Sequence, residues 1–306
     1  HPVAHSFPTR RSSDLVLLFF ALLMLVLSVL VTLVDFQQYG ELPRQWRGIF
    51  WQKNHTGLFL CLTSLICLLT CIETFHARNG WFYFACMLYV FSVSGMIFTD
   101  SASAMMSTLI LHGLVLLVLF WQRFRRLLTK THYRAALALF VVVVVGVSLN
   151  LDRLFGLFGR NISLTGRVPM WEQFFLLYFA KRPWFGYGFN AFWYQPSHRL
   201  VLGTVSGLPP IFIADNGFFD LLINTGIVGF ALFLLFYGGL WMRSIQIAVQ
   251  KPVINRFAYL LVMIFVLLGN LTWSMLFENE SMYMLILLAF LFLYEKHQKS
   301  KGSQIT

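Results

Sequence analysis

Long runs of apolar residues dominate the hydrophobic pattern of this chain. A helix needs about 20 such residues to cross roughly 30 Å of hydrocarbon. Runs that approach this length occur near 15–34, 56–75, 82–98, 103–121, 135–150, 223–242, 257–276 and 281–294. The pattern therefore predicts an all-α integral membrane protein, a bundle of about eight transmembrane helices.

A different pattern, in which an apolar stretch also contains charges, two prolines and paired glycines, covers residues 165–193. Its first part lies between Arg167 and Arg182. It predicts a helix of about 13 residues, which rises about 20 Å and is too short to cross the bilayer. Pro169 suits the first turn, and Pro183 stops the helix. We therefore expect a short interfacial helix inside one long loop, residues 151–222.

The first residues differ from the rest, because the tract HSFPTRRSSDL resembles translated sequencing-adapter sequence. We treat residues 1–14 as non-native and expect the chain to be an N-terminally truncated fragment.

Composition narrows the class of protein. The 306 residues are 58% hydrophobic and 11% charged, which excludes an ordinary soluble domain. The formal net charge of +11 is better explained by loop topology and anionic lipid-linked partners than by nucleic acid. All four cysteines lie inside apolar runs, without disulfide or metal-site spacing. We expect them to be packing residues, and we expect no metal site.

Lysine and arginine in the short loops predict the orientation of the spans. One alternating set of loops contains Arg78, the clusters at 123–134 and 243–256, and the tail at 296–301. The opposite short loops contain only Arg44, Arg47 and Lys53. The first set is therefore expected to be cytoplasmic. The predicted parts are five spans at 15–150, a periplasmic loop at 151–222, and three spans with a basic tail at 223–306.

Some residues of the long loop suit recognition of a phosphate. Arg167 and Trp171 are four residues apart, so a helix places a guanidinium beside an aromatic ring. A guanidinium matches phosphate oxygens well. Gly186 and Gly188 predict a tight bend that either lets the backbone approach a ligand or makes a simple turn. For each loop cation, ordinary solvated charge remains the alternative.

Four sequence pieces lie in the predicted outer loops or at the adjoining span ends. They are 46-WRGIFWQKNHTG-57, 99-TDSASA-104, 158-FGRNISLTGRVPMW-171 with 183-PWFGYGFNAFW-193, and 213-IADNGFFDLLINTGIVG-229. In order and topology they resemble the bacterial O-antigen ligase and O-antigen or exopolysaccharide polymerase superfamily, especially its exopolysaccharide-polymerase-like branch. The resemblance covers most of residues 45–290.

The resemblance implies a glycosyltransferase of the bacterial inner membrane that needs no metal or cofactor. Its donor would be a glycan on undecaprenyl pyrophosphate at the periplasmic face. Polymerisation of glycan repeats is the first expectation, and ligation to lipid A core or protein is the alternative. Such chemistry needs cations for the leaving pyrophosphate and a base for the acceptor hydroxyl. The expected donor-binding residues are Arg167, Arg160, Arg47, Lys53, Trp171, Gly186, Gly188 and Asn216.

The base is where the chain departs from the family, whose members usually carry His-Asn where this chain has Asp215-Asn216. An unperturbed aspartate has a pKa of about 4 and is a weak base unless burial raises that value. We rank Asp215 first and His198 second as the base, and the remaining alternative is an activity that is impaired or independent of a base. The alternative for Asp215 is to cap a helix over 215–242.

Two other classes stay open. A transporter also uses polar groups among helices, but it often shows repeated halves and charges near the bilayer midplane. This sequence shows no internal repeat, and its ionisable residues cluster at the outer rim, which favours an enzyme. The third possibility is a truncated, inactive reading frame.

Overall fold

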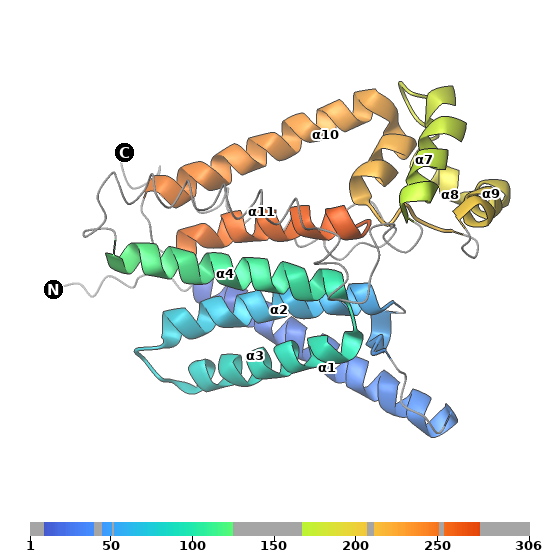
Figure 1. Cartoon of the computed structure of the whole chain (residues 1–306). Helices are drawn as coiled ribbons and strands as arrows, with labels where there is room; N and C mark the ends of the chain where they lie inside the picture. The colour runs from blue at the N-terminus through green and yellow to red at the C-terminus, as the bar shows by residue number, and fades with distance from the viewer. Residues whose placement is uncertain are drawn as a thin grey trace. The chain divides into compact units, whose positions relative to one another are not determined.

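The computed structural model describes residues 9–39, 45–50, 52–124, 167–206, 211–250 and 254–275. The chain divides into two compact units. These are the N-terminal unit, His1–Val118, and the C-terminal unit, Leu119–Thr306. Each unit is described by itself (Figure 1).

The N-terminal unit is built from apolar helices. Its elements are α1 (Thr9–Tyr39), the 3-10 helix η1 (Gly48–Phe50), α2 (Lys53–Thr74), α3 (Gly80–Thr99) and the start of α4 (Ala102–Phe124). Helix α2 packs along α3, and α1 packs against η1 and α2. Asn79 caps α3 by accepting a hydrogen bond from the Phe82 N–H at 3.2 Å. Asp100 ends the same helix in the left-handed conformation, with a φ of 50°.

The C-terminal unit combines two long helices with several short ones. Its described elements are α7 (Arg167–Leu177), η2 (Phe179–Lys181), α8 (Ala191–Tyr194), α9 (Pro196–Ser206), α10 (Gly217–Gln250) and α11 (Ile254–Thr272). Helix α10 packs on α11, where the Tyr237 hydroxyl donates to the Met263 carbonyl at 2.9 Å. Helix α7 packs on α9.

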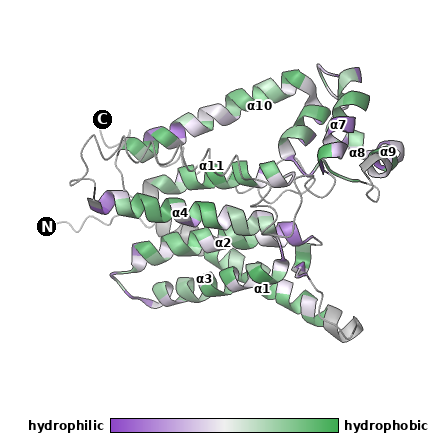
Figure 2. Ribbon diagram, viewed as in Figure 1, coloured by the Kyte–Doolittle hydropathy of each residue, from purple (hydrophilic) through white to green (hydrophobic). Residues whose placement is uncertain are grey.

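Four helices are long and apolar enough to cross a membrane. They are Lys53–Thr74, Gly80–Thr99, Ala102–Arg123 and Gly217–Val249. Shorter apolar stretches lie at Leu18–Val34 and Phe257–Thr272. Figure 2 shows predominantly hydrophobic residues along these helices. The described residues contain helices and no strand, so the all-α membrane class is confirmed. The spans expected at 135–150 and 281–294 lie outside the described residues.

Helix α10 is interrupted at Gly226, where φ is 67° and ψ is −170°. The helix expected over 215–242 therefore begins at Gly217 and is interrupted at Gly226. The cause is a close approach of residues 183–188, here called the 183–188 loop. A Cβ at Gly226 would collide with the Trp184 carbonyl and the Phe185 nitrogen, so only glycine fits.

The 183–188 loop hydrogen-bonds to the backbone of α10 on both sides of the break. The bonds are Tyr187 N–H to Ile223 O at 2.9 Å, Gly188 N–H to Asn224 O at 2.9 Å, Ile227 N–H to Pro183 O at 2.8 Å and Val228 N–H to Trp184 O at 3.1 Å. A broken helix leaves amides and carbonyls without helical partners, and such groups must be satisfied in a membrane protein. The loop supplies those partners.

Candidate functional site

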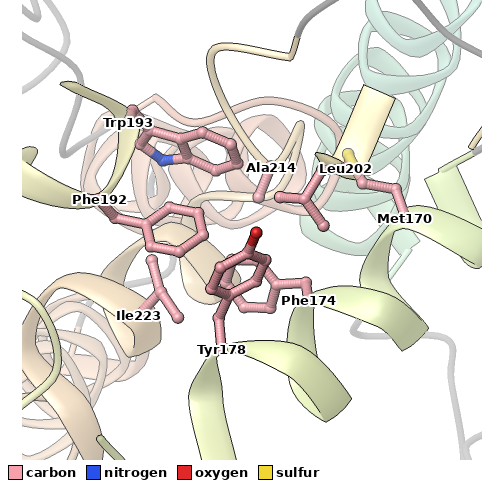
Figure 3. Close-up of a cluster of buried hydrophobic side chains, with 8 residues drawn as sticks. All are labelled: Met170, Phe174, Tyr178, Phe192, Trp193, Leu202, Ala214 and Ile223. Atoms are coloured by element: carbon pink, nitrogen blue, oxygen red, sulfur yellow. The ribbon is translucent and has the colours of Figure 1, made fainter. Parts of the chain in front are cut away.

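An aromatic core holds the short helices of the C-terminal unit together. Its buried members are Met170, Phe174, Tyr178, Phe192, Trp193, Leu202, Ala214 and Ile223. Figure 3 shows the rings of Phe174, Tyr178 and Phe192 gathered in this core. The Phe174 and Phe192 rings meet edge to face, with centroids 5.7 Å apart. The core therefore joins α7, α8 and α9 to the start of α10.

Arg167 lies at one edge of this core and starts α7, at the residue where the sequence predicts that helix to begin. Its Nε–H donates to Asp215 Oδ2 at 2.9 Å, and its Nη1 donates to the Thr272 carbonyl at 3.3 Å. The side chains of Arg167 and Asp215 are 19% and 28% exposed. A cation at a helix N-terminus is unfavourable for the helix dipole, and the Asp215 carboxylate offsets this. The ion pair thus stands partly open to a ligand.

Asp215 does not cap α10. The Asn216 side chain does so, because its Oδ1 accepts from Phe218 N–H at 3.0 Å and from Phe219 N–H at 3.2 Å. Asp215 has a φ of 53°, a left-handed conformation that aspartate tolerates better than most residues. The capping alternative for Asp215 is therefore corrected, and its carboxylate is turned to Arg167.

Ala214, the neighbour of Asp215, is held on both sides. Its carbonyl accepts from Trp171 Nε1 at 2.7 Å, and its N–H lies 3.2 Å and 3.1 Å from the two Asp220 oxygens. The Asp220 carboxylate is buried and also accepts from Trp193 Nε1 at 2.6 Å and from the Ser274 hydroxyl. Buried carboxylates require such partners. Asp220 is thus the hub that fixes the backbone of the ion pair.

The only sequence signal for the role of Asp220 is that a carboxylate lies in an otherwise apolar helix. The partners of Asp220 and Arg167 near residue 272 could not be predicted, because 105 residues separate Arg167 from Thr272.

His198 packs within the aromatic core and not beside the ion pair. Its ring centroid lies 4.5 Å from those of Phe192 and Tyr178. Its Nδ1 is 3.1 Å from the Phe192 carbonyl, which can only accept, so Nδ1 carries the hydrogen in this bond. Among the described contacts of His198, none joins it to Arg167 or Asp215.

Tyr187 is the residue of the 183–188 loop that packs against the aromatic core. Its hydroxyl donates to the Tyr178 carbonyl at 3.0 Å. Burial raises the pKa of Tyr187, although the nearby Arg182 lowers it in part. The phenol therefore keeps the proton that this bond requires.

Gly186 and Gly188 form the predicted bend, with φ values of 67° and 99°. A Cβ at Gly186 would collide with the backbone of Ile223 and Asn224. The close approach that Gly186 permits is therefore to α10, which is a structural role. Donor binding by either glycine stays a prediction.

In the N-terminal unit, the 46–57 and 99–104 pieces come together. The Trp46 N–H donates to the Phe98 carbonyl at 2.8 Å. Asp100 Oδ2 accepts from Lys53 Nζ at 3.2 Å and from Gln45 Nε2 at 3.1 Å. Arg47 is exposed in the same turn. Lys53 thus forms a small polar cluster with Asp100 and Gln45, while Arg160 lies outside the described residues.

The cysteines and potential metal ligands of the described segments do not form a metal site. All four cysteines are free, and Cys71 Sγ and Cys86 Sγ lie 3.3 Å apart. Within those segments, no three His, Cys, Asp or Glu residues are grouped to hold a metal ion.

The long apolar helices are typical of a multi-spanning membrane protein, and the polar site lies at the N-terminal end of α10. A family model described as O-Antigen ligase matches residues 85–234, a range that contains Arg167, Asp215 and Asp220. This match over residues 85–234 supports the O-antigen ligase and polymerase superfamily as the family that this part of the chain resembles. No curated protein matches the sequence. The family points to glycosyl transfer from a lipid-linked glycan to an acceptor, and together with the apolar helices it indicates a bacterial inner membrane protein.

Proposed function

We propose that this protein polymerises undecaprenyl-pyrophosphate-linked oligosaccharide repeats at the periplasmic face of the inner membrane, without a metal. The observation that carries the proposal is the half-buried Arg167–Asp215 ion pair inside the family-matched region. A guanidinium and a carboxylate at one place supply the two functions that glycosyl transfer from a pyrophosphate requires. These are stabilisation of the leaving group and acceptance of a proton.

Arg167 is proposed to bind the pyrophosphate. A guanidinium has five N–H donors, and the described contacts of Arg167 use its Nε and Nη1. The remaining donors suit phosphate oxygens. The dianionic group would also compete with Asp215 for the guanidinium, so that donor binding weakens the ion pair.

Asp215 is proposed to act as the base. The acceptor hydroxyl oxygen forms a bond to the anomeric carbon of the donor as its proton passes to the Asp215 carboxylate. The bond between that carbon and the pyrophosphate oxygen breaks, and undecaprenyl pyrophosphate leaves with its new charge beside Arg167. Water then takes the proton from Asp215. His198 remains the second candidate base.

The other residues take supporting roles in this proposal. Trp171 and Asn216 position the ion pair through Ala214 and through the start of α10. Arg160, Arg47, Lys53, Gly186 and Gly188 remain proposed donor-binding residues. Ligation to lipid A core or protein would use the same chemistry with a different acceptor.

The broken helix α10 is also a feature of transporters, in which discontinuous helices often bind substrates or ions. Four backbone groups at this break already have partners in the 183–188 loop. The break thus has a structural explanation without a bound ion, and this favours the enzyme.

The test supplies undecaprenyl-pyrophosphate-linked repeats to membranes that contain the full chain, with and without lipid A core. Longer glycan ladders without lipid A core indicate a polymerase, while glycan on lipid A indicates a ligase. If the donor stays intact, or only changes leaflet, the enzyme is excluded. Membranes that contain Arg167→Ala protein serve as the control.

A further inference from the structure

The segment after α7 exposes large aromatic side chains to its surroundings. We call them the exposed aromatic set, and they are Trp184, Phe185, Phe189 and Tyr194, which are 63%, 75%, 64% and 71% exposed. Side chains of this size contribute to the core wherever they can, as Phe192 and Trp193 do in the same segment. Side chains this apolar and this exposed need a partner that shields them from water.

The depth of this segment in the membrane follows from its bonds to α10. After the break at Gly226, residues 227–242, which precede Arg243, rise about 24 Å and so cover most of roughly 30 Å of hydrocarbon. The amides of Ile227 and Val228, which start this stretch, donate to the carbonyls of Pro183 and Trp184. Trp184 is thus tied to the end of a membrane-crossing helix, at the level where hydrocarbon gives way to headgroups.

Two cations stand next to this aromatic set. Lys181 and Arg182 are exposed and directly precede Pro183. The Arg182 guanidinium lies 5.1 Å from the centre of the Tyr187 ring, and Lys181 Nζ lies 5.7 Å from that of Tyr178. These contacts hold both charges close to the aromatic segment. Tryptophan and tyrosine favour the headgroup boundary, and basic residues there attract anionic lipids.

We propose that residues 181–194 form a membrane-interface anchor whose partner is the anionic phospholipid bilayer. Trp184 and Phe185 enter the boundary between acyl chains and headgroups, while Lys181 and Arg182 contact the lipid phosphates. This anchor rests on the bonds between the 183–188 loop and α10, and not on the proposed glycosyl transfer. It also explains how a segment without a membrane-spanning helix is held at a fixed depth.

The first test measures depth in the full chain, labelled with fluorotryptophan and placed in phosphatidylglycerol-containing nanodiscs. The signal of Trp184 is identified by its loss in Trp184→Phe protein. Lipids that carry a nitroxide near the top of the acyl chain should remove most of this signal, and a water-soluble gadolinium chelate should leave it. The buried Trp193, assigned with Trp193→Phe protein, should respond weakly to both agents. Loss of the Trp184 signal to the chelate would overturn the anchor. No response to either agent would also overturn it and would indicate a protein partner instead.

The second test measures the choice of lipid. Spin-labelled phosphatidylglycerol should broaden the Trp184 signal about fivefold more than spin-labelled phosphatidylcholine at the same content. In Lys181→Gln/Arg182→Gln protein the two lipids should act alike. Equal broadening in the unmodified chain would show that the cations do not select anionic lipid, which contradicts the proposal.

Discussion

At the scale of single residues, the backbone beside Asp215 is held by contacts that do not involve the Arg167–Asp215 ion pair. Trp171 and Asp220 hold the carbonyl and the N–H of Ala214. The pair can therefore exchange its partners while its backbone stays in place. Substitutions of the two charged residues should consequently change glycan transfer more than they change folding.

For Arg167 we expect Arg167→Ala to lower the rate of glycan transfer by about 100-fold or more, because a preorganised donor to the leaving group is lost. Arg167→Lys should recover only part of the rate, since an ammonium cannot reproduce the fork of the guanidinium. The measurement is the growth of glycan ladders at saturating lipid-linked donor, with thermal unfolding as the control for folding. A fully active Arg167→Lys protein would show that the fork is not needed.

For the base, Asp215→Asn keeps a side-chain oxygen for Arg167 but cannot accept the acceptor proton. We expect a loss of about 100-fold or more in the transfer rate. His198→Gln is the matched comparison, because His198 lies in the aromatic core, and we expect its rate to fall far less. If Asp215→Asn protein keeps its activity and His198→Gln protein loses it, the two roles are reversed.

At the scale of elements, the break in α10 depends on one glycine. Gly226→Ala would place a Cβ against the Trp184 carbonyl and would force alanine into a positive-φ, extended-ψ conformation that is essentially restricted to glycine, at a cost of about 1–3 kcal/mol or more. We expect a lower midpoint of thermal unfolding in detergent and faster amide exchange in residues 183–188.

Gly238→Ala is the control for this substitution, because nothing lies within 4 Å of a Cβ at Gly238 in the same helix. Alanine is the better helix former, so this variant should be as stable as the unmodified chain or slightly more stable. Equal unfolding of the Gly226→Ala and Gly238→Ala proteins would contradict the role of the break.

The elements also show what a sequence can predict. The start of α7 at Arg167 follows from local signals, chiefly Pro169 in its first turn, and the long apolar helices follow from their length. The break at Gly226 does not, because Gly229, Gly238 and Gly239 stand in the same apolar run and look alike. The choice of Gly226 is set by residues 183–188, which are distant in the sequence, and hydrophobic pattern carries no such information.

Some features of the candidate site could likewise be predicted from the sequence, and others could not. Arg167, Trp171 and Asp215 were predicted from their chemistry and from the family resemblance, and the structure brings them together. The sequence offers Asp215 as a helix cap only as the alternative to its role as base, whereas Asn216 is the residue that caps α10, and adjacent Asp and Asn are equally good caps in a sequence. Only the backbone angles distinguish the two.

At the scale of the whole molecule, the open question is which face of the membrane carries residues 167–206. We expect the periplasmic face, since lysine and arginine favour the opposite loops. Single cysteines at Ser197 and Ala77, both exposed, can be placed in a chain without native cysteines. A membrane-impermeant maleimide should label Ser197→Cys in intact cells and Ala77→Cys only after lysis. The reverse labelling would remove the basis of the proposed reaction.

The bonds that tie the 183–188 loop to α10 have a consequence for how the bilayer acts on the protein. A helix tilts when the hydrocarbon around it becomes thinner or thicker. Residues 227–249 cannot tilt without pulling on Pro183 and Trp184, whose carbonyls their first amides hold. That movement continues through the short helices to Arg167. We therefore expect the acyl-chain length of the lipids to change the strength of the Arg167–Asp215 ion pair.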